Sequence, residues 1–153
     1  MKPTEGVGAE GLGLVRKPIV YLVGGQGLEP LAACQSSGTL AAIVSNNYAE
    51  AVVRYLALTG LADRVVHVEG RDPSDPTLMK PSPHLIENAA RSLGVRTTAC
   101  VFIGDQTSDM EAGRAAGTRT IGYANKPGKA DALAVAGADV VVATMAEVAV
   151  AIR

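Results

Sequence analysis

From residue 40 onward, short runs of β-branched and apolar residues alternate with longer segments whose apolar residues recur at helical spacing. Because strands joined through helices return to the same end of a sheet, they pair in parallel. The alternation therefore predicts a three-layer, Rossmann-like α/β sandwich with a mainly parallel sheet. The predicted strands cover residues 40–45, 64–69, 99–104, 118–123 and 138–143.

The predicted helices carry their own boundary residues. Three pairs have the spacing of a capping box, and glycines follow the last periodic residue of several helices. Ser82 and Pro83 further predict the start of a helix near residue 83. The capping pairs are Asn47 with Glu50, Ser108 with Glu111, and Thr144 with Glu147, and the glycines are Gly60, Gly94, Gly117 and Gly137.

The first 38 residues have a different composition. Residues 17–25 predict a strand and residues 28–38 a helix, whereas residues 1–16 are Gly-rich with scattered charge and predict a flexible leader. Residues 17–153 are expected to form a single core domain. Gly6, Gly8 and Gly11 spell G-x-G-x-x-G, but no strand precedes them, so we do not assign dinucleotide binding there.

Composition excludes several classes of protein. The 153 residues suit one domain, and a formal net charge of −1 with no Trp and one Phe argues against a nucleic-acid surface. No apolar stretch approaches the roughly 18 residues of a membrane span, and the start does not resemble a secretory signal.

Cys34 and Cys100 have no metal-site or redox spacing, which favours reduced packing residues in a cytoplasmic protein. The sequence does not indicate the oligomeric state.

Three segments bring polar residues to one edge of the predicted sheet, where ligands of parallel α/β proteins bind. Two of these segments end predicted strands, and the third precedes a predicted helix. Ser45 and Asn46 offer a hydroxyl and the free amides of a helix start to a phosphate group. Lys80 adds one ammonium, and Asp105 and Asp109 add two carboxylates four residues apart. Hard oxygen ligands suit Mg²⁺, so the set predicts a Mg²⁺ and phosphoryl site.

Each residue also has a purely structural interpretation. Ser45 and Asn46 can cap a helix, Lys80 can be a solvated loop residue, and Asp109 can be a first-turn helix acid. Asp105 is harder to explain structurally, because it directly follows a glycine at the end of an apolar strand. The order and spacing of the whole set favour function over each separate alternative.

These segments, "AAIVSNN", "LMKPSPHLIENAARSLGV" and "ACVFIGDQTSDMEAGRAAGTRTIGYANKPGK", closely resemble the haloacid dehalogenase (HAD) superfamily of phosphatase-type hydrolases over residues 40–150. The resemblance implies that Ser45 binds phosphate and that Asp105 and Asp109 hold Mg²⁺. It implies that Lys80 is a catalytic residue, whose charge neutralises the phosphoryl oxygens and the nucleophile. It implies a phosphate-bearing small molecule as ligand. No catalytic role is assigned to the segment that begins "GYANKPGK".

The first motif of that family, D-x-D-G-T/V, is not recognisable. In the family its first Asp attacks phosphorus and its second is the general acid/base, but Gly24 and Gln26 stand at these positions and Gly27 matches the motif glycine. Neither replacement can perform the chemistry. The interval from Gly24 to Ser45 is short, which implies no cap domain, and the lost carboxylate implies weak Mg²⁺ binding.

Three hypotheses follow. The favoured one is a degenerate binding or interaction domain that retains a Mg²⁺/phosphate half-site, weak or inactive as a phosphatase. The alternative is an active phosphohydrolase that uses a metal-bound water or a nucleophile from another subunit. The third is that the start of this chain is not the natural one and that the motif lies upstream.

Overall fold

The computed structural model describes residues 19–21, 31 and 39–151. The predicted leader at 1–16, the helix at 28–38 apart from Leu31, and Gly24, Gln26, Gly27 and Cys34 lie outside the described residues. The strands are β2 (Ile19–Tyr21), β3 (Ala41–Val44), β4 (His67–Glu69), β5 (Val101–Gly104), β6 (Arg119–Tyr123) and β7 (Val140–Val142). The α-helices are α3 (Ala49–Thr59), α4 (His84–Leu93), α5 (Thr107–Ala116), α6 (Lys129–Val135) and α7 (Met145–Ala151).

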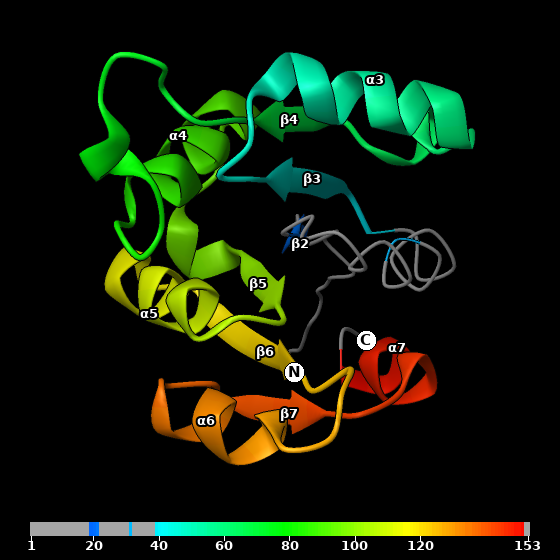
Figure 1. Cartoon of the computed structure of the whole chain (residues 1–153), viewed down its shortest axis with the longest axis vertical. Coiled ribbons are helices and arrows are strands. Elements are labelled where there is room, and N and C mark those ends of the chain that lie inside the picture. Colours follow the sequence, from blue (N-terminus) through cyan, green and yellow to red (C-terminus); the bar gives the residue numbers. More distant parts are fainter. Residues whose placement is uncertain (1–18, 22–30, 32–38, 152–153) are drawn as a thin grey trace, which may run out of the picture.

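The six strands form one sheet in the order β4-β3-β2-β5-β6-β7, and every neighbouring pair is parallel. Figure 1 shows them stacked from β4 near the top to β7 near the bottom. The order reverses at β2, which lies between β3 and β5. The predicted parallel α/β fold is therefore confirmed, and the edge beyond β3, β2 and β5 is the expected place for a ligand.

The observed strands lie inside the predicted ranges and start one to three residues later. Tight 3₁₀ turns at Ala62–Arg64 and Thr97–Ala99 end on Arg64 and Ala99, the first residues that the pattern assigned to β4 and β5. Val65 and Cys100, which follow these turns, pack in the apolar core before the strands begin, so hydrophobicity alone extends the predicted strand too far.

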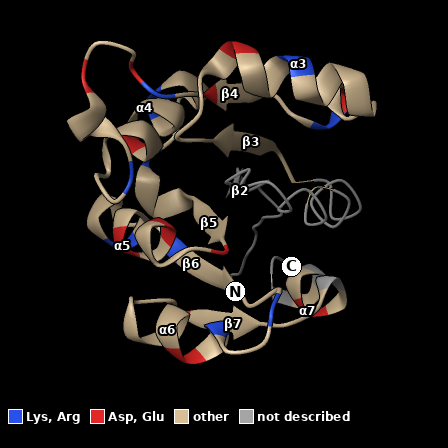
Figure 2. Cartoon of the chain, viewed as in Figure 1, with Lys and Arg blue, Asp and Glu red and all other residues tan. Residues whose placement is uncertain are grey.

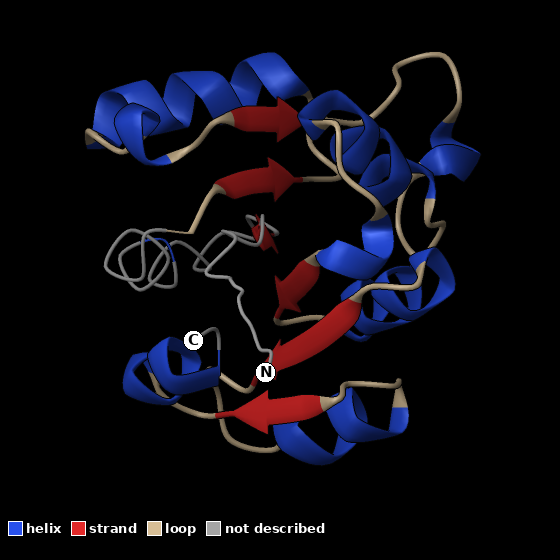
Figure 3. Ribbon diagram, turned by 180° about the vertical axis from the view of Figure 1, so that it is seen from behind, coloured by secondary structure: helices blue, strands red, loops and turns tan. Residues whose placement is uncertain are grey.

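Helices cover both faces of the sheet, as Figure 3 shows from behind. Because successive strand residues point to opposite faces, Ile43 packs with one apolar cluster and Val44 with the other. Val52 and Leu56 of α3 join the first cluster. The second cluster contains Val44, Leu85, Ile86, Ala89, Ala90, Cys100, Phe102, Ala112 and Ala116, which brings α4 and α5 onto that face.

The helix ends test the boundary predictions. Gly60, Gly94 and Gly117 adopt left-handed conformations directly after α3, α4 and α5, as predicted. Thr144 and Glu147 form the predicted reciprocal capping contacts, with Glu147 N donating to Thr144 Oγ1 and Thr144 N to Glu147 Oε1. The capping box at Ser108 is wrong, because α5 already begins at Thr107 after Gln106.

The box at Asn47 is also wrong. Helix α3 begins at Ala49, one residue later than predicted, and its N-cap Tyr48 makes no side-chain capping bond. The predicted helix start at Ser82 and Pro83 is likewise shifted by one residue, to His84, although the Ser82 hydroxyl still accepts from His84 N at 3.2 Å. Where several short polar residues follow one another, each of them can cap the N-terminus of a helix. The packing of the helix then decides which residue becomes the N-cap.

Residues 46–79 contain α3, β4 and two 3₁₀ turns and add no separate domain to the sheet. None of the helices in the described ranges is both long and apolar enough to cross a membrane. Figure 2 shows Lys and Arg positions interspersed with Asp and Glu positions along the helices and loops.

Candidate phosphate and metal site

Ser45 lies at the end of β3 and is 2% exposed. Its backbone N–H continues the pairing with β4 by donating to Glu69 O at 2.9 Å, which fixes its position at the sheet edge. Its hydroxyl oxygen accepts from Asn47 N at 3.0 Å. A hydroxyl is one donor and two acceptor sites, so this bond leaves the Ser45 O–H proton for another acceptor.

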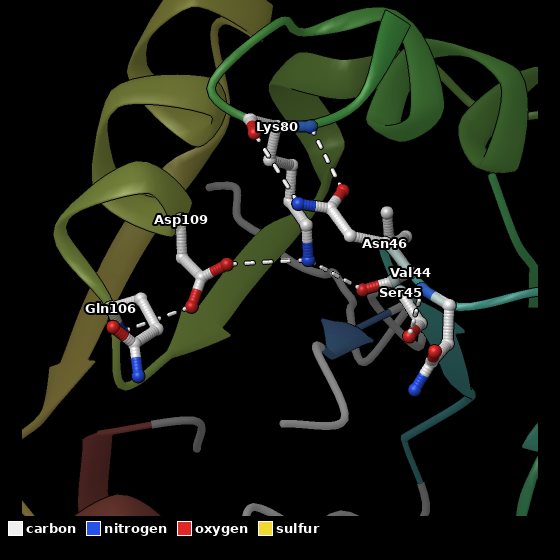
Figure 4. Close-up of polar contacts among 7 residues, drawn as sticks. Val44, Ser45, Asn46, Lys80, Gln106 and Asp109 are labelled. Atoms are coloured by element: carbon white, nitrogen blue, oxygen red, sulfur yellow. Dashed lines mark hydrogen bonds and ion pairs between the residues drawn. The ribbon is translucent and has the colours of Figure 1, made fainter. Parts of the chain in front are cut away.

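Lys80 is buried in the same region, with a residue exposure of 5%. Its ammonium donates to Val44 O at 2.8 Å and lies 3.2 Å from Asp109 Oδ1, as Figure 4 shows. The same nitrogen lies 5.6 Å from the centre of the Phe102 ring. An ammonium has three N–H donors. Among the described residues, the Val44 carbonyl accepts one of them and the Asp109 carboxylate faces a second, so a third can donate to a ligand.

Asn46 fixes the backbone of Lys80 across 34 residues of sequence. Its side-chain oxygen accepts from Lys80 N at 2.9 Å, and its side-chain nitrogen donates to Lys80 O at 3.3 Å. The sequence indicated Asn46 as a phosphate ligand, whereas the structure shows its side-chain amide joined to the loop that carries Lys80. No feature of either segment alone indicates this pairing.

Asp109 is fully buried in the first turn of α5. Its Oδ2 accepts from Gln106 N at 3.0 Å, while Oδ1 faces Lys80 and makes no hydrogen bond within the described residues. Gly104 makes room for this carboxylate, because a Cβ at residue 104 would lie 2.5 Å from Asp109 Oδ2. The glycine before Asp105 is therefore required by the close approach of α5 to the end of β5.

Asp105 is held by the segment that follows β6. Lys129 Nζ donates to Asp105 O at 2.9 Å and to Asp105 Oδ2 at 3.3 Å, and Asn125 Nδ2 donates to the same Oδ2 at 3.4 Å. Both partners lie in the "GYANKPGK" segment, for which the sequence indicated no role. The spacing of these residues shows no motif, so only the fold reveals the contact.

Burial shifts the protonation of the central pair. Desolvation lowers the pKa of Lys80 from 10.5 to about 8, although the nearby charges of Asp109 and Asp105 act in the opposite direction. Desolvation likewise raises the pKa of Asp109, against the effect of Lys80. The charge of Asp105 opposes the fall in the pKa of Lys80 and adds to the rise in the pKa of Asp109, so all three residues lie within electrostatic range of one another.

The donor chemistry of the site fits Mg²⁺ in part. The buried Oδ1 atoms of Asp109 and Asn125 lack a hydrogen bond within the described residues, and hard oxygens of this kind suit the ion. However, the described ranges contain no group of three or more His, Cys, Asp or Glu side chains able to hold a metal ion. The two carboxylates therefore supply an incomplete ligand set, and Asp105 already contacts an ammonium.

A parallel sheet with helices on both faces and polar groups at its switch point defines a Rossmann-like α/β protein. Within that class the chain belongs to the family described as haloacid dehalogenase-like hydrolase, whose sequence model matches residues 26–123. It is a HAD-superfamily protein of the phosphatase type, as the resemblance of its motifs predicted.

Curated relatives are phosphatases. The chain is 30% identical over 120 residues to phosphoglycolate phosphatase of Pectobacterium atrosepticum, which covers 78% of this chain and 50% of that protein. It is 35% identical over 95 residues to N-acetylmuramic acid 6-phosphate phosphatase of Pseudomonas aeruginosa, covering 60% of this chain and 40% of that protein. The chain thus spans about half the length of these relatives or less.

Solved structures agree with the family assignment. A HAD-like protein of unknown function from Agrobacterium tumefaciens has a TM-score of 0.73 at 27% identity, covering 79% of this chain and 57% of that one. A HAD family hydrolase from Deinococcus radiodurans with bound phosphate and sodium has a TM-score of 0.64 at 34% identity, covering 78% of this chain and 54% of that one.

Proposed function

We propose that the chain binds a phosphate-bearing small molecule together with Mg²⁺ at the edge of the sheet beyond β3 and β5, and that it is weak or inactive as a phosphatase. The observation that carries the proposal is the ammonium of Lys80, buried and directed by Val44 O and Asp109 Oδ1. A buried lysine is costly. Its placement at the sheet edge, on the carbonyl of the residue before Ser45, favours the recognition of an anion.

Each residue of the site has its own role in binding a phosphoryl group. The Lys80 ammonium neutralises its charge, the Ser45 hydroxyl donates to one of its oxygens, and Asn46 positions Lys80 through its backbone. Asp105 and Asp109 are the proposed Mg²⁺ ligands, and the bound ion would supply additional charge neutralisation. Positioning and neutralisation are most of what phosphoryl transfer requires of a protein.

The nucleophile is the missing element. In the family it is an Asp after the first strand, and Gly24 stands at that position in this sequence, with Gln26 in place of the acid/base. Glycine offers no nucleophile, and an amide does not titrate near neutral pH. We therefore propose a half-site, meaning a site with the second to fourth family motifs but without the first, within a core domain covering residues 17–153.

Calorimetric titration with tungstate, a stable oxyanion that resembles phosphate, tests this function. We expect Lys80→Met to weaken tungstate binding by roughly tenfold or more, because a charge-assisted hydrogen bond is lost. Lys126→Met, which removes an exposed lysine, serves as the matched control and is expected to bind as the wild type does. Equal tungstate affinity of Lys80→Met and wild type would contradict the proposal.

A further inference from the structure

The carboxylate of Asp105 contacts a lysine to which neither the sequence nor the family resemblance assigned a role. Lys129 Nζ lies 3.3 Å from Asp105 Oδ2 and donates to Asp105 O at 2.9 Å, so one ammonium binds the same residue twice. The side chain of Lys129 is 26% exposed and that of Asp105 only 11%. This pair is thus largely shielded from water, in contrast to a surface ion pair.

The backbone before α6 places this ammonium. Lys129 is the first residue of α6 and follows Gly128, which has a φ of +87° and acts as the N-cap. This left-handed residue turns the chain at the start of the helix, a conformation that glycine adopts without strain. Asn125, four residues earlier, donates to the same Oδ2 at 3.4 Å. Two donors from one loop therefore occupy a single oxygen of Asp105.

The charges at the sheet edge are balanced without any metal ion. Asp109 lies 3.2 Å from the ammonium of Lys80, and Asp105 lies 3.3 Å from that of Lys129. A divalent cation binds where carboxylate charge exceeds the positive charge nearby. Here each carboxylate already has its own ammonium, so a dication adds two positive charges to a neutral group of four side chains.

We infer that Lys129 is an internal competitor of Mg²⁺ for Asp105 and sets how weakly the half-site binds a divalent cation. The inference rests on the proposed function, which makes Asp105 a metal ligand. Mg²⁺ binds carboxylate oxygens at about 2.1 Å, and an ammonium that stays bonded to the same oxygen repels it. Binding of the ion at Oδ2 therefore requires Lys129 to leave this oxygen, and binding at the other carboxylate oxygen places the ion close to the Lys129 ammonium. In both cases the ammonium weakens the metal affinity.

Calorimetric titration with Mn²⁺, as a probe of the Mg²⁺ site, tests the inference without measuring activity. Lys129→Met removes the competing charge and is expected to raise Mn²⁺ affinity by roughly tenfold. Lys129→Arg keeps a cation at the same place and is expected to stay close to wild type. Lys126→Met, which removes an exposed lysine of the same loop, is the matched control and is expected to change nothing.

Asp105→Asn separates this inference from the proposed function. If Lys129→Met raises Mn²⁺ affinity and Asp105→Asn in that background removes the gain, both statements are supported. If Asp105→Asn lowers affinity but Lys129→Met leaves it unchanged, the competition is refuted while Asp105 remains a ligand. If Asp105→Asn has no effect in either background, or no variant binds Mn²⁺, both the competition and the metal assignment are wrong. Circular dichroism of each variant confirms that it is folded.

Discussion

The ammonium of Lys80 lies 3.2 Å from Oδ1 of Asp109, and both side chains are only 1% exposed. A buried ion pair of this kind contributes little net stability compared with an apolar pair of the same size, but removing one partner is costly. The pair lies at the edge of the sheet beyond β3 and β5, where a ligand is expected, and this position is better explained by function than by stability. The first prediction follows from this asymmetry.

Lys80→Met is expected to destabilise the fold by roughly 3 kcal/mol, because it leaves the Asp109 carboxylate buried without a counter-charge. The double variant Lys80→Met/Asp109→Asn is expected to recover a large part of the loss, since an amide is neutral and its oxygen can still accept from Gln106 N. Urea unfolding at neutral pH measures both. Additive losses in the double variant would show that the two residues do not interact.

The sequence predicted the parallel fold and the approximate position of each strand, because apolar periodicity is a local property of the chain. It also indicated Ser45, Lys80 and Asp109, of which Lys80 and Asp109 contact each other and Lys80 contacts the Val44 carbonyl next to Ser45. It did not indicate the Asn46 contacts with Lys80. Those bonds join segments 34 residues apart, and neither segment carries a pattern for the other.

Lys129 illustrates the same limit. The sequence offers both Lys126 and Lys129 in one Gly- and Pro-containing loop, and nothing in their order indicates which one reaches Asp105. The choice depends on the left-handed turn at Gly128 and on the position of α6 beside α5. Side-chain contacts between such loops are determined by tertiary packing, which a single sequence does not display.

The second prediction concerns pH. Burial lowers the pKa of Lys80 to about 8, so the folded protein loses this positive charge as pH rises through about 8. We expect tungstate affinity to fall over that range, and Lys80→Arg to remove the dependence, because arginine stays charged. Calorimetry at about pH 7 and about pH 9.5 makes the comparison. An affinity independent of pH in the wild type would contradict the role of Lys80.

The lowered pKa of Lys80 makes tungstate affinity fall with rising pH, but it makes the stability of the fold rise. Between about 8 and 10.5 the unfolded chain, with an ordinary lysine pKa, binds a proton that the folded chain has released. The unfolded state then holds more protons, so the free energy of unfolding contributed by Lys80 rises with pH across this window. Urea unfolding of wild type and Lys80→Met at the two pH values isolates the contribution of this residue.

The third prediction concerns Gly104. A Cβ at residue 104 would lie 2.5 Å from Asp109 Oδ2, so Gly104→Ala displaces the carboxylate that holds Lys80. We expect a loss of about 1–3 kcal/mol in stability, as for an overpacked core, together with weaker tungstate binding. Gly60→Ala is the control. It adds a Cβ at a φ of +74° with nothing within 4 Å, so it is expected to cost about 1 kcal/mol without affecting binding.

Calorimetry and urea unfolding of both glycine variants distinguish a local effect from a general one. Equal loss of tungstate binding in Gly60→Ala and Gly104→Ala would mean that stability alone limits binding. Unchanged binding in a folded Gly104→Ala would mean that the position of Asp109 does not matter for the anion.

The last prediction concerns catalysis. The wild-type chain is expected to show little or no turnover of a generic phosphomonoester, and Gly24→Asp/Gln26→Asp is expected to raise it by supplying the nucleophile and the acid/base together. The reason is that Ser45, Lys80 and the two aspartates already supply positioning and charge neutralisation, while loss of a nucleophile removes many orders of magnitude in rate.

The measurement compares wild type, the double variant and the double variant with Asp105→Ala, each purified free of host phosphatase. Turnover that appears only in the double variant and disappears with Asp105→Ala would support the half-site. Mg²⁺-dependent turnover by the wild type, abolished by Asp105→Ala alone, would instead establish an active enzyme whose nucleophile lies elsewhere, including on another subunit.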